Sequence, residues 1–148
     1  MTIRRIVTEN VGNRSRVASD DLAPHTWCDE IWATTPQDPL GVDPGTQPKP
    51  LTPPPGATAC RMVALPPDAV MRAGLARGSV EGVDPDGFHR TNTVDYVFVL
   101  DGPVELVLDD GSVEVGPGDC VVQRGTNHAW RNHGDAPIRL MTFMVGLP

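Results

Sequence analysis

The 148-residue chain has few cysteines, few aromatic residues and no long apolar run. The three cysteines, Cys28, Cys60 and Cys120, lie far apart and form no CxxC pair, which argues against a disulfide framework or a cysteine-rich zinc site. We interpret them as small buried or half-buried thiols in a reducing cytoplasm. No apolar stretch approaches the roughly 20 residues that cross a bilayer, and the N-terminal residues lack the apolar core of a secretory signal. We therefore expect a cytoplasmic protein with no membrane partner.

Basic residues are also in the minority. Lys and Arg number 12 against 19 Asp and Glu, and the net charge of −7 would repel a phosphate backbone, so we expect no nucleic-acid partner. Hydrophobic residues make up only 39% of the chain, while Gly (15) and Pro (16) are abundant, a composition that favours short strands joined by turns over long helices. The length suits a single domain with one core, which we assign to residues 1–148.

The N-terminal part of the chain predicts two strands, Ile3–Thr8 and Trp27–Thr34, and then a proline-rich segment. Residues 36–56 contain eight prolines, which exclude a helix or a central strand. We expect this segment to be an extended, polyproline-like arm on the surface or over the mouth of a barrel. Because the residues before it are too few to form a core, we assign 1–56 as N-terminal strands and arm, and 57–147 as the barrel of the same domain.

From residue 57 onward, short β-forming runs alternate with turn residues. Asp101-Gly102 and Asp110-Gly111 are typical of hairpin turns, and strands at roughly eight- to ten-residue spacing favour an antiparallel barrel or sandwich. Only Ala69–Ala76 resembles a helix, and weakly. The expected strands are Cys60–Leu65, Val94–Leu100, Val104–Leu108, Val113–Val115, Cys120–Gln123 and Ile138–Val145. The chain is therefore expected to be all-β.

The alternation of side chains along these strands predicts a site. Residues an even number apart share a face, so His89, Thr91 and Asp95 are expected to point inward, and His128 and Trp130 form a second series with one orientation. The interior of a small barrel holds side chains and one small ligand. Two imidazoles and one carboxylate suit a divalent first-row metal that keeps positions open for water or substrate.

Two stretches around these residues have a recognisable spacing. In the first, HRTNTVD spans residues 89–95 and Gly102 follows after six further residues. In the second, QRGTNHAWRN spans residues 123–132 and contains Gly125, His128 and Asn132. Together they resemble the two motifs of the cupin superfamily, and the resemblance covers roughly residues 57–147. It implies an antiparallel double-stranded β-helix, or jelly-roll barrel, with an N-terminal strand-and-loop extension.

The resemblance also implies a ligand set, with three departures from the usual motifs. Thr91 stands where the family usually has its second His, Asp95 replaces a Glu, and Gln123 replaces a Pro. The implied metal ligands are His89, Asp95 and His128, with Fe(II) or Zn(II) as the preferred metal and Mn(II) or Ni(II) as the others. Asp95 and His128 are the candidate catalytic residues, and Thr91, Gln123 and Trp130 the candidate substrate-pocket residues. The alternative is that the site has lost its metal.

Other side chains near the motifs have competing interpretations. Tyr96 has the opposite parity to Asp95, so we expect it on the outer face, and Phe98 is expected in the core or at a dimer contact. Arg90, Arg124 and Arg131 flank the ligand positions. They would either clamp a substrate carboxylate or phenolate, or form salt bridges with the many acidic residues.

The phrases HRTNTVDY and VVQRGTNHAW are similar to those of small bacterial and fungal cupins, some of them encoded with secondary-metabolite pathways. The resemblance therefore implies a metal-dependent enzyme that acts on an oxygenated organic substrate. Its reaction would be oxidation or dioxygenation, or else dehydration, isomerisation or decarboxylation. Two other functions remain open: a non-catalytic small-ligand-binding or sensor protein, and a metal-free acid–base catalyst. A homodimer is the expected assembly.

Overall fold

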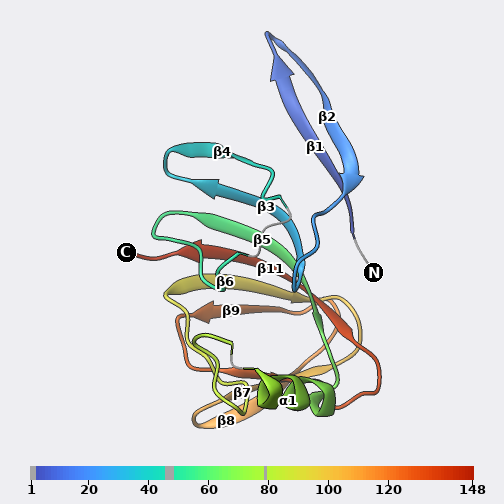
Figure 1. The fold of residues 1–148 in the computed structure, drawn as a ribbon, viewed down its shortest axis with the longest axis vertical. Helices are drawn as coiled ribbons and strands as arrows, with labels where there is room; N and C mark the ends of the chain where they lie inside the picture. Colours follow the sequence, from blue (N-terminus) through green and yellow to red (C-terminus); the bar gives the residue numbers. More distant parts are fainter. Residues whose placement is uncertain (1–2, 46–48, 79) are drawn as a thin grey trace.

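The computed structural model describes residues 3–45, 49–78 and 80–148, and nearly all of its regular structure is antiparallel β (Figure 1). Its strands are β1 (Arg4–Val11), β2 (Arg14–Leu22), β3 (Asp29–Thr35), β4 (Asp38–Val42), β5 (Thr58–Leu65), β6 (Thr93–Val99), β7 (Val104–Leu108), β8 (Gly111–Val115), β9 (Cys120–Arg124), β10 (Ala129–Arg131) and β11 (Ile138–Gly146). One helix, α1 (Asp68–Arg77), occurs in this part of the chain. The expected all-β class is confirmed.

Two sheets form the barrel. The larger has six strands in the order β4-β3-β5-β11-β6-β9, and the smaller has three in the order β10-β7-β8, with every pairing antiparallel. The buried apolar side chains of both sheets pack into one core: Leu65, Val97, Val99, Val104, Leu106, Val115, Trp130, Ile138 and Leu140. The antiparallel jelly-roll barrel expected from the sequence is confirmed.

The alternation along β6 also follows the expectation. Asp95 and Val97 face inward and are buried, whereas Tyr96 and Phe98 face outward with 44% and 37% of their surface exposed. Tyr96 therefore lies on the outer face, as predicted. Phe98 stacks edge-on against Phe143 of β11 on that outer face and is not part of the core.

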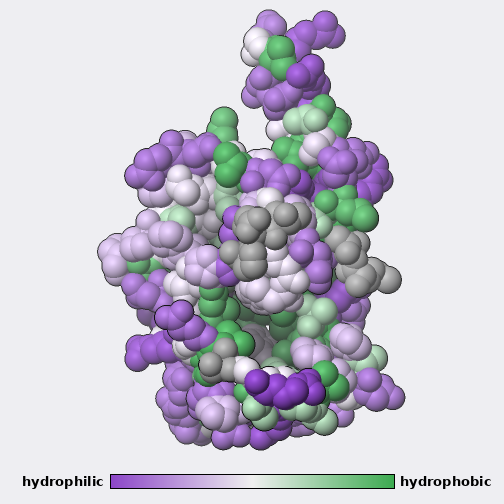
Figure 2. Space-filling model, viewed as in Figure 1, coloured by the Kyte–Doolittle hydropathy of each residue, from purple (hydrophilic) through white to green (hydrophobic). Residues whose placement is uncertain are grey.

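Strands β1 and β2 form a separate two-stranded hairpin that projects from the barrel (Figure 1). In the space-filling view it stands clear of the body, and its surface is largely hydrophilic (Figure 2). Arg5 joins it to the barrel, because its buried guanidinium donates to the Ile31 carbonyl (3.1 Å) and pairs with Asp43. The sequence predicted β1 only as Ile3–Thr8 and did not predict β2.

The prediction that residues 36–56 are an extended loop is wrong for Asp38–Val42, which form β4. Strand β4 is the edge strand of the larger sheet, a position where Pro39 is tolerated because the strand needs hydrogen bonds on one side only. Residues 46–48 of the segment lie outside the described residues. Near its end the segment contacts the sheet, because Arg61 donates hydrogen bonds to the carbonyls of Pro50 and Leu51, at 2.9 and 2.8 Å.

Helix α1 is longer and more regular than the weak candidate Ala69–Ala76. The backbone N–H of Asp68 donates to the Asn132 carbonyl, and the Asp68 carboxylate accepts from the Asn132 N–H, each at 3.0 Å. These tertiary contacts fix the start of a helix whose own sequence has little apolar periodicity. Within the described part of the chain, no helix has the length and apolar character needed to cross a membrane.

Candidate active site

An inner cavity of about 200 Å³ lies inside the barrel. Its walls are mainly apolar and include Val63, Leu65, Met71, Val97, Leu140 and Met144. Among the residues expected at the site, His89, Asp95, His128 and Trp130 line this cavity. Thr91 and Gln123 are buried but do not belong to its lining. The barrel thus brings the proposed ligand residues to one apolar chamber.

The two histidines are held side by side by the backbone. The N–H of His89 donates to the His128 carbonyl at 3.0 Å, and the N–H of His128 donates to the His89 carbonyl at 3.1 Å. The ring centroids are 4.3 Å apart. Gly125 allows the loop before His128 to pass close to the segment that precedes β6: its φ is +63°, and a Cβ there would lie 3.2 Å from the Thr91 carbonyl oxygen. These backbone contacts therefore hold the two imidazoles next to each other.

Hydrogen bonds to backbone carbonyls set the tautomer of both rings. The Nδ1 of His89 donates to the Gly87 carbonyl (3.1 Å), and the Nδ1 of His128 donates to the Thr126 carbonyl (2.9 Å). Because a carbonyl oxygen can only accept, Nδ1 carries the proton and Nε2 of each neutral ring presents a lone pair. Burial, reinforced by the neighbouring His89, lowers the pKa of His128 to about 4. His128 is therefore neutral at pH 7.

Asp95 is the buried carboxylate beside this pair. Burial raises its pKa, and the hydroxyls of Thr93 and Thr91 together with the nearby His89 oppose that rise. Its Oδ1 atom is buried without a hydrogen-bond partner among the described residues. Because a buried, unpaired carboxylate oxygen is costly, this atom calls for a donor or a cation.

The chemistry of these donors fits a divalent metal. Two imidazoles whose Nδ1–H groups are anchored on carbonyls are oriented as metal-ligating histidines usually are, and the buried carboxylate of Asp95 offers an oxygen ligand of the right type. Over residues 3–45, 49–78 and 80–148, however, no group of three or more His, Cys, Asp or Glu side chains is arranged to hold a metal. The two imidazoles lie together, but Asp95 does not form a ready-made three-ligand group with them.

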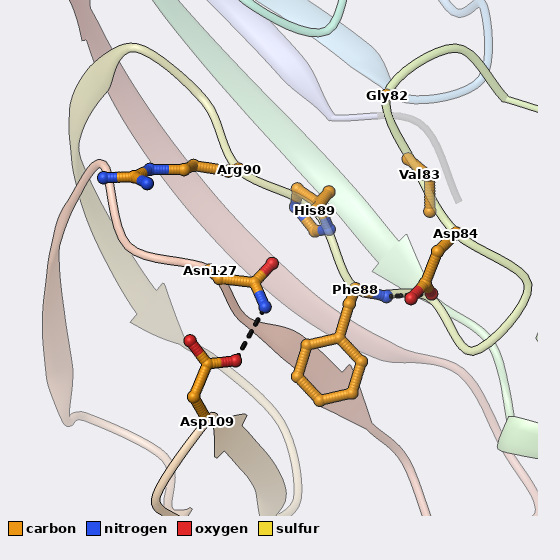
Figure 3. Close-up of a pocket in the computed structure, with 8 residues that line it drawn as sticks. All are labelled: Gly82, Val83, Asp84, Phe88, His89, Arg90, Asp109 and Asn127. Carbon is orange, nitrogen blue, oxygen red and sulfur yellow. Dashed lines mark hydrogen bonds between the residues drawn. The ribbon is translucent and has the colours of Figure 1, made fainter.

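A wider outer cleft of about 570 Å³ reaches His89 and is lined by Gly82, Val83, Asp84, Phe88, His89, Arg90, Asp109 and Asn127 (Figure 3). Val83 and His89 line both the outer cleft and the inner cavity, so they stand at the entrance between the two. Across the cleft, Asn127 Nδ2 donates to Asp109 Oδ1 at 2.8 Å. A ligand that reaches the inner cavity from this side passes His89.

The three arginines near the motifs do not form the salt bridges considered above. Arg90 Nε donates to the Gly125 carbonyl (2.7 Å), and the buried Arg131 places its guanidinium 5.7 Å from the centre of the Phe88 ring. None of the three is ion-paired within the described residues, and none lines the inner cavity. Only Arg90 lines the outer cleft, so it alone remains a candidate clamp there.

Arg61 lines the inner cavity and was not predicted. Its buried guanidinium pairs with the buried Glu30 carboxylate, with Nε and Oε2 3.0 Å apart. The signal was present in the sequence, because Arg61 shares the parity of the apolar residues Val63 and Leu65 in the middle of an apolar strand. Since Glu30, Pro50 and Leu51 already bind its guanidinium, Arg61 offers little free charge to a ligand.

Comparison with known proteins supports the resemblance to cupins. Residues 79–145 match the family model described as a cupin domain. The chain is 40% identical over 96 residues to protein C′ of the phomopsin biosynthesis cluster of Diaporthe leptostromiformis, covering 64% of this chain and 46% of that protein. A cupin-domain-containing oxidoreductase of Neurospora crassa is 42% identical over 61 residues, covering 38% and 31%. The chain thus spans less than half the length of these relatives.

Among solved structures, the cupin domain of an XRE family transcriptional regulator from Enterobacter cloacae is similar. It is 18% identical, covers 62% of this chain and 83% of that chain, and gives a TM-score of 0.44.

Proposed function

We propose that this chain, which matches the cupin-domain family over residues 79–145, is a metal-dependent enzyme acting on an oxygenated organic compound in the inner cavity. One observation carries the proposal: the Nε2 lone pairs of His89 and His128 are fixed by carbonyl contacts on Nδ1, in the cavity that the buried Asp95 also lines. Similarity to proteins named for biosynthesis clusters and to cupin-domain-containing oxidoreductases supports a small-molecule substrate and an oxidation.

Each residue of the site has a proposed role. His89, His128 and Asp95 would hold the metal, preferably Fe(II) or Zn(II), with Mn(II) or Ni(II) as the other candidates. When bound, the metal supplies Lewis acidity toward a substrate oxygen, and iron adds redox chemistry. The apolar walls, Trp130 among them, bind the carbon skeleton and exclude water. Asp95, whose pKa is raised by burial, can accept a substrate proton on its carboxylate.

Metal content tests this proposal directly. Protein purified without chelator or a nickel column should contain about one metal per chain, and His89→Ala and His128→Ala should each reduce that content strongly. His133→Ala is the matched control, because its side chain is 67% exposed and lies outside the inner cavity. A metal-free protein that neither Fe(II) nor Zn(II) can reconstitute would exclude the proposed chemistry.

A non-catalytic binding or sensor protein is the second candidate. It is favoured by the lack, among the described residues, of a ready-made group of three metal ligands. Metal-free acid–base catalysis by His89, His128 or Asp95 is the third. A ligand that binds equally well with and without chelator, and is recovered unchanged, would favour the binding protein. Turnover that persists in chelator would favour the acid–base catalyst.

We also propose that the protein is a homodimer in the cytoplasm. The outer face of the larger sheet carries a row of exposed apolar side chains, Val122, Tyr96 and Phe143, which are paired across β9, β6 and β11. Phe98 and Val145 extend this row. An exposed apolar surface of this kind is typical of protein contacts, and a second copy would cover it.

A further inference from the structure

Strands β6 and β9 place Asp95 directly opposite Gln123. Both side chains face the interior, with only 6% and 3% of their surface exposed. Directly paired residues of antiparallel strands have Cβ atoms about 4.5–5.5 Å apart, which is within reach of one hydrogen bond between their side chains. Gln123 is thus the cross-strand neighbour of Asp95 on β9.

These two side chains each carry a buried polar atom without a partner, and the two atoms are complementary. Oδ1 of Asp95 is an acceptor without a donor, and Nε2 of Gln123 is a donor without an acceptor, among the described residues. Buried polar groups in folded proteins are nearly always hydrogen-bonded, so two such atoms on facing residues are exceptional. A small rotation of both side chains would satisfy both atoms at once.

The orientation of the Gln123 amide is fixed by its other end. The Thr126 hydroxyl donates to Gln123 Oε1 at 2.6 Å, which leaves Nε2 as the free end of the amide. The carbonyl of the same Thr126 accepts the hydrogen bond from Nδ1 of His128, at 2.9 Å. Gln123 therefore touches the residue that sets the His128 tautomer and also faces Asp95.

We propose that Gln123 is a positioning residue, whose Nε2 donates to Oδ1 of Asp95 and which, through Thr126, fixes that carboxylate relative to the His128 imidazole. With one carboxylate oxygen held by Gln123, the other is directed to the inner cavity. The role of Gln123 in binding rests on the proposed function, whereas the hydrogen bond itself does not. Gln123 then acts behind the site and not as a wall of the substrate pocket.

The hydrogen bond is tested by NMR on chelator-treated, metal-free protein. The side-chain amide signals of Gln123 are identified by their loss in Gln123→Leu. Asp95→Ala should shift these signals and speed their exchange with water, because the acceptor is removed. Val121→Ala is the matched control: Val121 also faces inward on β9, but pairs with Val97, and its truncation should leave the signals in place. Unchanged signals in Asp95→Ala would overturn the proposal.

The functional role is tested by the affinity for Co(II), used as a spectroscopic probe of divalent metal binding. Loss of a group that orients a metal ligand typically weakens metal binding about 10–100-fold, and we expect that loss in Gln123→Leu. Val121→Ala removes no polar contact of the site and should bind Co(II) with wild-type affinity even if it melts at a lower temperature. Equal Co(II) affinity of wild type and Gln123→Leu would refute the positioning role. A wild-type protein that binds no Co(II) would instead refute the metal function, and the NMR result would still decide the hydrogen bond.

Discussion

Acidification should destabilise this protein through His128. Its folded-state pKa is about 4 because it is buried, against an ordinary value of 6.5 in the unfolded chain. The unfolded chain therefore binds a proton below about pH 6.5 that the folded protein refuses until about pH 4. The contribution of His128 to stability is complete above the unfolded pKa and is lost progressively as the pH falls through this window.

The size of the effect follows from the two pKa values. At pH 5 the unfolded histidine is almost fully protonated and the folded one is mostly neutral, so the free energy of unfolding should be about 2 kcal/mol lower than at pH 8. The full loss near pH 3 would approach about 3 kcal/mol. Asp95 acts in the opposite direction at the acidic end, because its raised pKa means that the fold takes up a proton before the unfolded chain does.

Urea unfolding at several pH values, in the presence of chelator, measures this dependence. His128→Asn isolates it, because the Asn amide keeps a donor for the Thr126 carbonyl but does not titrate. The difference between wild type and variant should shrink by about 2 kcal/mol from pH 8 to pH 5, while Asp95 contributes equally to both and cancels. If His128→Asn shows the same pH dependence as wild type, the reasoning about burial is wrong.

Three further outcomes are expected. Arg61→Met should lower the free energy of unfolding by about 3–5 kcal/mol in urea titrations, because Glu30 is left buried without its partner, and the double variant with Glu30→Leu should lose less. In thiol titrations with Ellman's reagent, the exposed Cys120 should react in the native state. Cys28 should react only on unfolding, because burial raises its pKa to about 12, and fast labelling of Cys28 in the native state would contradict its burial. Tyr96→Glu should convert a dimer to a monomer in light-scattering chromatography with little change in melting temperature, and a wild-type monomer would contradict the expected assembly.

Local sequence signals predicted the barrel well where turns and alternation coincide. Asp101-Gly102 and Asp110-Gly111 do separate β6, β7 and β8, because these turns need residues that tolerate unusual backbone angles. The missed strands lack such signals. The sequence of β2, RSRVASDDL, is largely polar since the hairpin buries almost nothing, and β10 is only three residues long. Strand β4 contains a proline that only its place at the sheet edge makes acceptable.

At the site, alternation predicts which side chains face inward but not which of them line the cavity. Parity correctly turned His89, Asp95 and Trp130 inward, and all three line the inner cavity. Thr91 and Gln123 also turn inward and are buried, yet they lie outside its lining.

Parity decides which face a side chain occupies, but the depth of that side chain in the barrel depends on the register with the next strand. For Gln123 that register sets it opposite Asp95, a relation between two strands that are separated along the chain by β7 and β8. A residue two positions from a motif glycine can therefore be part of the polar network without touching the ligand. This explains why alternation predicts that Gln123 faces inward but does not predict that it lies outside the lining of the inner cavity.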